Sequence, residues 1–122
     1  MRSVEFKVVR FRPNLGLEEF VNIGVLVYFP WLGKSESLFT KNLDKAKALH
    51  KSMDTDHWNS FLSDFTKNFN DRSKTSKESM SVLFKQFIPV SESSLFLSET
   101  RQTLVPDTDN PINFVFNMFV KD

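Results

Sequence analysis

The side chain with the clearest potential for chemistry, Asn22, lies in an otherwise apolar stretch of the sequence. Residues 20–33 carry no charged side chain, and β-branched and aromatic residues dominate them. This composition predicts a central strand that is covered on both faces. Within it, Asn22 would bury a carboxamide beside Gly24, which has no side chain. Asn22 could present its amide to a ligand that approaches the strand at Gly24, or it could bind a neighbouring segment and stabilise the fold.

The alternation of side chains along a strand predicts what surrounds Asn22. One face would carry the apolar set Val21, Ile23, Val25, Val27 and Phe29. The opposite face would carry Phe20, Asn22, Gly24, Leu26 and Tyr28, and Glu19 would lie just before the strand. We therefore interpret five residues as the candidate ligand-binding or structural polar site: Asn22, Gly24, Glu19, Tyr28 and Arg10.

A preceding strand is predicted from the alternation of Val4, Phe6 and Val8 with polar residues. The apolar positions then slip to Val9 and Phe11, which predicts a β-bulge between Val8 and Val9. Residues 13–16 have the composition of a turn, so the two strands should form an antiparallel hairpin.

This hairpin would bring Glu19 close to Arg10 or Arg12. We interpret the contact as a surface ion pair, which contributes about 0.2–1 kcal/mol. The alternative is an anion-binding or general-acid group at the mouth of a pocket.

Other residue types that support catalysis or metal binding lack the required spacing. His50 and His57, with Asp54 and Asp56 between them, match no ligand motif, so no metal site is predicted. The absence of cysteine excludes thiolate catalysis and cysteine-based zinc sites. The three glycines form no phosphate-binding loop, and no serine lies in a glycine-flanked elbow. We predict no catalytic residue and no cofactor, which favours a non-enzymatic role.

The charge distribution bears on nucleic-acid and membrane binding. A formal net charge of +1 predicts no strong overall attraction to nucleic acid or to an anionic membrane. A basic cluster leaves nucleic-acid binding as an alternative, although we interpret it as a solvated surface: Lys67, Arg72, Lys74, Lys77 and Lys85. The uncharged run is too short to cross a bilayer and the N-terminus resembles no signal peptide, so we expect a soluble, cytoplasmic protein.

The remaining elements follow from hydrophobic periodicity. A short strand is predicted near residues 37–40, and a short helix over residues 42–51. A longer helix, capped by Thr55 or Asp56, would carry the apolar stripe Trp58, Phe61, Leu62, Phe65 and Phe69. Residues 70–79 have the composition of a loop, and helical spacing returns between Met80 and Phe87. Residues 95–97 predict a strand, which residues 103–105 would continue or return.

These elements predict a single domain, residues 1–122, of the α+β class. It would contain a small antiparallel sheet of three to four strands, with a β-hairpin at the N-terminus, and three to four packed helices. Fourteen phenylalanines predict an aromatic core.

The C-terminal segment, residues 111–121, fits a helix or an edge strand. Pro111 at a first helical position and Asp109 as a cap favour the helix. Phe114 and Met118 would form a second apolar strip and leave only a narrow polar side, so the helix should be buried on more than one side or should dock onto another chain. We therefore predict an interface at Phe114 and Met118, with Trp31 as a further member, for a homodimer or a partner protein.

The segment Glu19-Phe20-Val21-Asn22-Ile23-Gly24-Val25 resembles the bacterial family known as domain of unknown function 3037. Members begin with a short strand that ends in proline, to which residues 6–13 are similar. Glu18 stands where the family often has glycine, and residues 43–49 and 95–120 are also similar to it. The family has no established activity to carry over. Its genes are often reported near HipA-type serine/threonine kinases, which implies a partner role.

Three functions are therefore open. The first is a non-enzymatic interaction or regulatory module, with a HipA-type kinase as the implied partner. The second is a small-molecule-binding or enzymatic domain with a pocket around Asn22 and Gly24. The third is nucleic-acid binding through the basic surface.

Overall fold

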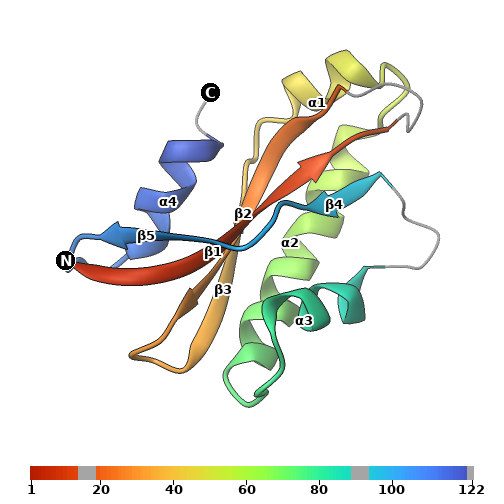
Figure 1. Cartoon of the computed structure of the whole chain (residues 1–122). Helices are drawn as coiled ribbons and strands as arrows, with labels where there is room; N and C mark the ends of the chain where they lie inside the picture. The colour runs from red at the N-terminus through yellow and green to blue at the C-terminus, as the bar shows by residue number, and fades with distance from the viewer. Residues whose placement is uncertain (14–18, 89–93, 121–122) are drawn as a thin grey trace.

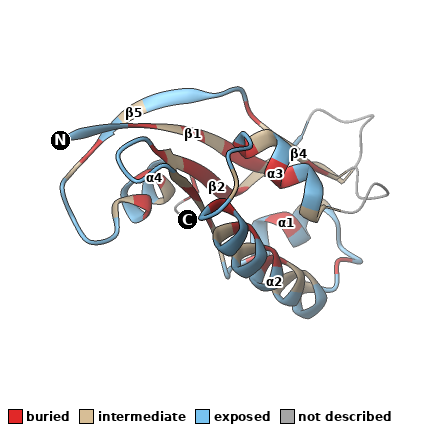
Figure 2. Ribbon diagram, turned by 90° about the horizontal axis from the view of Figure 1, so that it is seen from below, coloured by how far each residue is buried: buried red, intermediate tan, exposed pale blue. Residues whose placement is uncertain are grey.

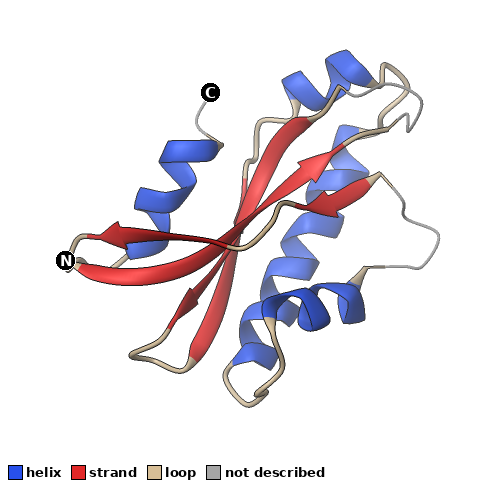
Figure 3. Cartoon of the chain, viewed as in Figure 1, coloured by secondary structure: helices blue, strands red, loops and turns tan. Residues whose placement is uncertain are grey.

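The chain is described from a computed structural model, which defines residues 1–13, 19–88 and 94–120. The described residues form five strands and four helices (Figure 1, Figure 3). In chain order they are β1 (Arg2–Phe11), β2 (Val21–Phe29), β3 (Lys34–Phe39), α1 (Asp44–Leu49), α2 (Thr55–Ser73), α3 (Met80–Phe87), β4 (Leu95–Leu97), β5 (Arg101–Val105) and α4 (Pro111–Phe119). The predicted α+β class is confirmed.

All strand pairs in the single sheet are antiparallel, in the order β3-β2-β1-β4, and β5 also pairs with β1. β4 and β5 follow each other along the same edge of β1, so the second segment continues the first. Ser98 fills the break between them. Its Oγ accepts a hydrogen bond from Val8 N (2.8 Å), and its N–H donates to Val8 O (2.9 Å).

Each face of the sheet packs in its own hydrophobic core. We call them the α4 core, which includes Ile112 and Val115, and the α2 core, which includes Leu62, Phe65 and Phe69. α4 lies on one face, whereas α1, α2 and α3 lie on the other (Figure 1). Val4, Phe6 and Val8 pack in the α4 core, and Val9 and Phe11 pack in the α2 core. The buried strands between the helices are visible in Figure 2. The apolar residues of β1 thus shift from the face covered by α4 to the face covered by α2, without an extra residue in the strand. The predicted bulge between Val8 and Val9 is wrong.

A bulge does occur one residue later, between Val9 and Arg10 of β1, but the extra residue belongs to β2. Val9 is opposite Gly24 and Arg10 is opposite Asn22, so Ile23 has no partner of its own. Such a bulge reverses the alternation of side chains along the strand. The predicted shared face is consequently wrong. Val21 and Ile23 pack in the α2 core, whereas the α4 core holds Val25, Val27 and Phe29.

The helices follow their predicted patterns with shifted ends. The stripe of α2 is confirmed, but its N-cap is Asp54, whose Oδ1 accepts from His57 N (3.1 Å), and the helix extends to Ser73 into the predicted loop. Residues 111–119 are helical, as favoured, with Pro111 in the first turn. The N-cap of α4 is Asn110 and not Asp109, and it makes no side-chain capping bond.

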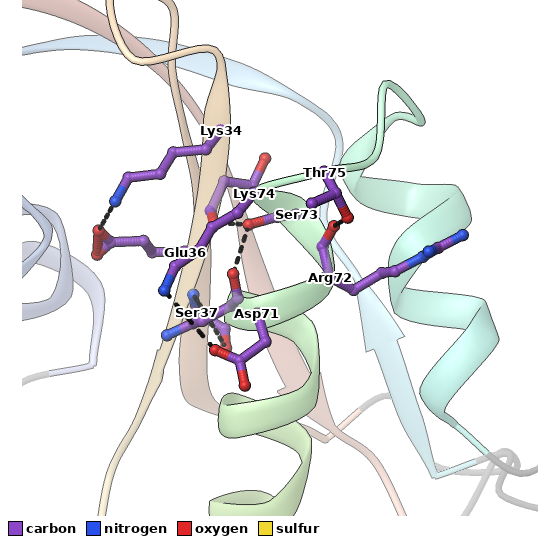
Figure 4. A network of polar contacts seen from close by, with 10 residues as sticks. Lys34, Glu36, Ser37, Asp71, Arg72, Ser73, Lys74 and Thr75 are labelled. Atoms are coloured by element: carbon purple, nitrogen blue, oxygen red, sulfur yellow. Dashed lines mark hydrogen bonds and ion pairs between the residues drawn. The ribbon is translucent and has the colours of Figure 1, made fainter.

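Side chains of α2 cover the outer edge of β3. Ser37 N donates to Asn70 Oδ1 (2.7 Å), and Ser73 Oγ donates to Ser35 O. Figure 4 shows the helix and the strand joined at Ser37 and Ser73. An uncovered edge strand is a template for unwanted pairing, so these bonds both fasten α2 and protect this part of the edge.

Asn70→Ala is expected to lower the free energy of unfolding by about 1–3 kcal/mol, because it leaves the N–H of buried Ser37 without a partner. Urea denaturation measures the change. Asn68→Ala, on an exposed position of the same helix, is the control and should change stability by less than about 0.5 kcal/mol. Equal stability of the two variants would contradict the role given to Asn70.

Candidate functional site

The face of the sheet that carries α4 is only half covered by it. α4 ends beside Asn22, and beyond this point no helix of the described residues lies on this face of the sheet. Arg10 of β1, Arg12 directly after β1, Phe20 before β2, and Phe96 of β4 occupy this uncovered half. We call these four residues the arginine–phenylalanine platform.

Strand register explains how the platform forms. Arg12 directly follows β1, and its N–H donates to Ser94 O (2.7 Å), which continues the pairing with the segment of β4. Arg10 and Arg12 are two residues apart, so both side chains point to the same face of the sheet. Phe96 is opposite Arg10 on the neighbouring strand and therefore shares that face. Leu95 and Leu97, on either side of Phe96, point into the α2 core. Three separate segments thus supply the four side chains.

The arginines are stacked on the aromatic rings. Arg10 Cζ lies 4.6 Å from the centroid of the Phe20 ring, and Arg12 Cζ lies 4.5 Å from that of Phe96. The two rings meet edge to face, with centroids 5.7 Å apart. A cation over an aromatic face contributes about 0.5–1 kcal/mol at exposed sites and more where water is excluded. The stacking restrains both guanidinium groups and both rings.

The guanidinium groups are left with unused donors. The Nε atoms of Arg10 and Arg12 are buried without a hydrogen-bond partner among the described residues. The terminal Nη groups are not buried, and no described residue accepts a bond from them. Phe20 remains 42% exposed beside them. A planar guanidinium with free N–H groups favours bidentate binding of a carboxylate or phosphate.

Asn22 lies at the border between the platform and α4. Its Nδ2 donates to Phe119 O (2.9 Å), the last carbonyl of α4, which has no partner within the helix. Its Oδ1 is buried and accepts no hydrogen bond within the described part of the chain. This bond joins the end of α4 to β2, as expected for the structural role, and the ligand-binding role of Asn22 stays a prediction.

Asn22→Ala is expected to destabilise the protein by about 1 kcal/mol, because the bond to the helix end is lost. Thermal unfolding followed by circular dichroism measures the change. Asn117→Ala, at an exposed position of α4, removes a carboxamide without this bond and is the control. An unchanged midpoint for Asn22→Ala would show that the contact does not hold α4.

The other predicted site residues are not gathered around Asn22. Gly24 faces the α2 core, where Phe39 occupies the adjoining space. Tyr28 lies six residues along β2, roughly 20 Å away by strand geometry, opposite Glu5 and Ser35. Glu19 is exposed and forms no ion pair with a described residue, and Arg10 stacks on Phe20 instead. Of the predicted set, Asn22 and Arg10 lie opposite each other in the β1–β2 pair.

The predicted interface residues are exposed. Phe114 is 38% and Met118 is 45% exposed on the outer side of α4. The side chain of Trp31 packs edge to face on Phe29 and lies under Arg2, whose Cζ is 4.8 Å from its ring.

His50, His57 and Lys74 of the basic cluster all lie at exposed positions. His50 contacts Ser52 Oγ (3.1 Å) on an exposed turn, and within the described ranges no three His, Cys, Asp or Glu residues could hold a metal ion. Lys74 pairs with Asp71 (3.8 Å) at the exposed end of α2. None of the described helices has the length and apolar composition needed to cross a membrane.

Sequence reasoning identifies Arg10 and Arg12 but not their aromatic partners. It places Phe20 in a covered strand, and Phe96 in a strand without a stated role. The signal is an arginine pair two residues apart at the end of one strand, with one phenylalanine just before a neighbouring strand and another within the second neighbouring strand. This signal can be recognised only when the pairing of β4 with β1 is known.

Comparison with known proteins identifies a family but no described relative. Neither a curated protein nor a solved structure matches the chain. Residues 6–120 match the family model described as protein of unknown function (DUF3037). This range contains residues of all five strands, the whole platform and α4. The chain belongs to the DUF3037 family.

Proposed function

We propose that this protein is a non-enzymatic interaction module of the bacterial cytoplasm, which binds an acidic segment of a partner protein through the arginine–phenylalanine platform. The observation that carries the proposal is the stacking of two arginines on two phenylalanines, on the half of the α4-bearing sheet face that no described helix covers. The resemblance noted in the sequence makes a HipA-type serine/threonine kinase the first partner to test.

The composition of the platform supports a protein interface. Arginine and aromatic residues are enriched at interface centres, and arginine is frequent among the residues that dominate binding energy. The stacking restrains the long arginine side chains before binding, so less conformational entropy is lost when a partner docks. A carboxylate would meet the free Nη groups, while its neighbouring side chains would pack on Phe20.

Single-stranded nucleic acid is the competing ligand, because aromatic residues on an open sheet can stack on bases. One face of each ring is already occupied by an arginine, and the rings also contact each other. Stacking of bases on these faces would require the arginines to move. The net charge of +1 provides little additional attraction to a polyanion.

Arg10→Glu combined with Arg12→Glu is expected to abolish capture of the partner. Tagged wild-type protein and variants are purified from the native host, and a HipA-type kinase is also tested directly as a purified protein. Lys47→Glu with Lys51→Glu changes the net charge equally, at exposed positions elsewhere, and is the control that should retain the partner.

Two results would contradict the proposal. A partner retained by the platform variant but lost by Phe114→Glu with Met118→Glu would place the interface on α4. Binding of a single-stranded oligonucleotide that the platform variant alone abolishes would assign the platform to nucleic acid. Circular dichroism of each variant separates loss of binding from loss of folding.

A further inference from the structure

A second candidate site lies between the edge of β3 and α2, away from the platform. The groove there has a volume of about 520 Å³. Its main lining residues are Phe39, Lys41, Asn59, Leu62, Thr66 and Lys67. We call it the β3–α2 groove, and it does not depend on the function proposed for the platform.

The backbone of β3 turns hydrogen-bonding groups into this groove. Thr40 N donates to Ile23 O (2.8 Å), so the even-numbered residues of β3 bond to β2. In an antiparallel pair the intervening residues turn both N–H and C=O to the outer edge. Ser35 and Ser37 meet α2 there, but no described residue bonds to the outward backbone groups of Phe39.

The polar stripe of α2 explains why the groove stays open. Asn59, Thr66, Asn70 and Ser73 recur at helical spacing along the side of α2 that faces β3. At the C-terminal end, Asn70 and Ser73 reach the strand edge directly. At the N-terminal end, Asn59 and Thr66 face the groove instead. The helix and the strand edge therefore leave a slot with polar groups on both sides.

The floor and the rim of the groove define what it can hold. Phe39 and Leu62 are nearly fully buried and form an apolar floor. Lys41 and Lys67 are exposed at the rim and have no ion-pair partner among the residues described. An extended backbone would meet the N–H and C=O of Phe39, alternate apolar side chains would enter the floor, and acidic side chains would meet the lysines.

We infer that the β3–α2 groove binds an extended acidic peptide segment, which adds as a short strand to the edge of β3 at Phe39. This mode takes its affinity from main-chain hydrogen bonds and its specificity from the pockets for alternate side chains. The free edge is short, because α2 covers Ser35 and Ser37, so the peptide extends only from Phe39 towards Lys41.

The probe is a panel of blocked hexapeptides in which valine or isoleucine alternates with aspartate or glutamate. Nuclear magnetic resonance of the full ¹⁵N-labelled chain should show saturable shifts at Phe39, Asn59 and Thr66, and slower hydrogen exchange of the Phe39 amide. Replacing the central apolar residue of the peptide by proline should abolish these effects, because proline removes a donor.

Lys41→Glu with Lys67→Glu should weaken binding at least about threefold, through loss of two exposed charge pairs. Lys47→Glu with Lys51→Glu is the matched control. The inference is overturned if no peptide of the panel shifts these residues. It is also overturned if the proline peptide binds equally, or if free glutamate gives the same shifts, which would indicate a small-anion site. Arg10→Glu with Arg12→Glu should leave peptide binding in the groove unchanged.

Discussion

Phe65→Ala is expected to lower the free energy of unfolding by about 3–5 kcal/mol. The Phe65 ring lies at the centre of the α2 core and is almost fully buried. It contacts four other rings, with centroid distances of 5.4 to 6.3 Å: Phe39, Phe69, Phe84 and Phe87. Removing it opens a cavity that joins β3, α2 and α3, and rigid rings collapse poorly into such a space.

Denaturant unfolding followed by fluorescence measures this loss, and Phe114→Ala is its control. The same substitution on the exposed side of α4 should cost no more than about 0.5 kcal/mol in the isolated protein. If Phe65→Ala lowers the free energy of unfolding by less than about 1 kcal/mol, the Phe65 ring does not pack against these four rings as described.

Gly24→Val is expected to destabilise the protein by about 3 kcal/mol, although valine has the higher strand propensity. A Cβ at this position would lie 2.9 Å from Leu38 O and closer still to the Phe39 ring. Real Cβ atoms do not approach a backbone oxygen so closely, so β3 would have to move. Thermal and urea unfolding measure the effect.

Gly24→Ala with Phe39→Leu tests the cause of that loss. If the ring of Phe39 is the main obstacle, the alanine variant should be less destabilised in the leucine background than in the wild type. Gly33→Asn is the control, because Gly33 has a φ of 64°, which asparagine tolerates, and a Cβ added there would meet no atom within 4 Å. Wild-type stability of Gly24→Val would show that nothing lies against Gly24.

Local elements are predictable from the sequence because their periodicity is strong. The stripe of α2 and the helical pattern of residues 80–87 follow from the spacing of large apolar residues, and both are confirmed. The preference for a helix at residues 111–119 follows from Pro111. Helix caps are less predictable, since Asp54, Thr55 and Asp56 are adjacent residues that can all cap.

The faces of β2 are not predictable from alternation alone. One extra residue, Ile23, reverses the pattern, and a buried strand is apolar on both faces in any case. This reversal separates Asn22 from Gly24, which simple alternation places side by side. It also places Asn22 beside α4 and next to the platform.

The platform depends on contacts between residues distant in sequence. Phe96 reaches Arg12 only because β4 pairs with the far end of β1. No local pattern encodes that pairing, since short strands carry little periodicity of their own. The arginine pair is visible in the sequence, whereas the aromatic surface that orients it is not.

Titration of the ¹⁵N-labelled protein with a hexaglutamate peptide at low ionic strength tests the platform most directly. The predicted result is a saturable shift of the Arg10 and Arg12 side-chain signals, together with the backbone amides of Phe20 and Phe96. Phe20→Ala with Phe96→Ala removes no charge, yet it should weaken this binding because the guanidinium groups lose their support. Shifts that are confined to the exposed lysines, or binding unchanged in the phenylalanine variant, would contradict a positioned arginine pair.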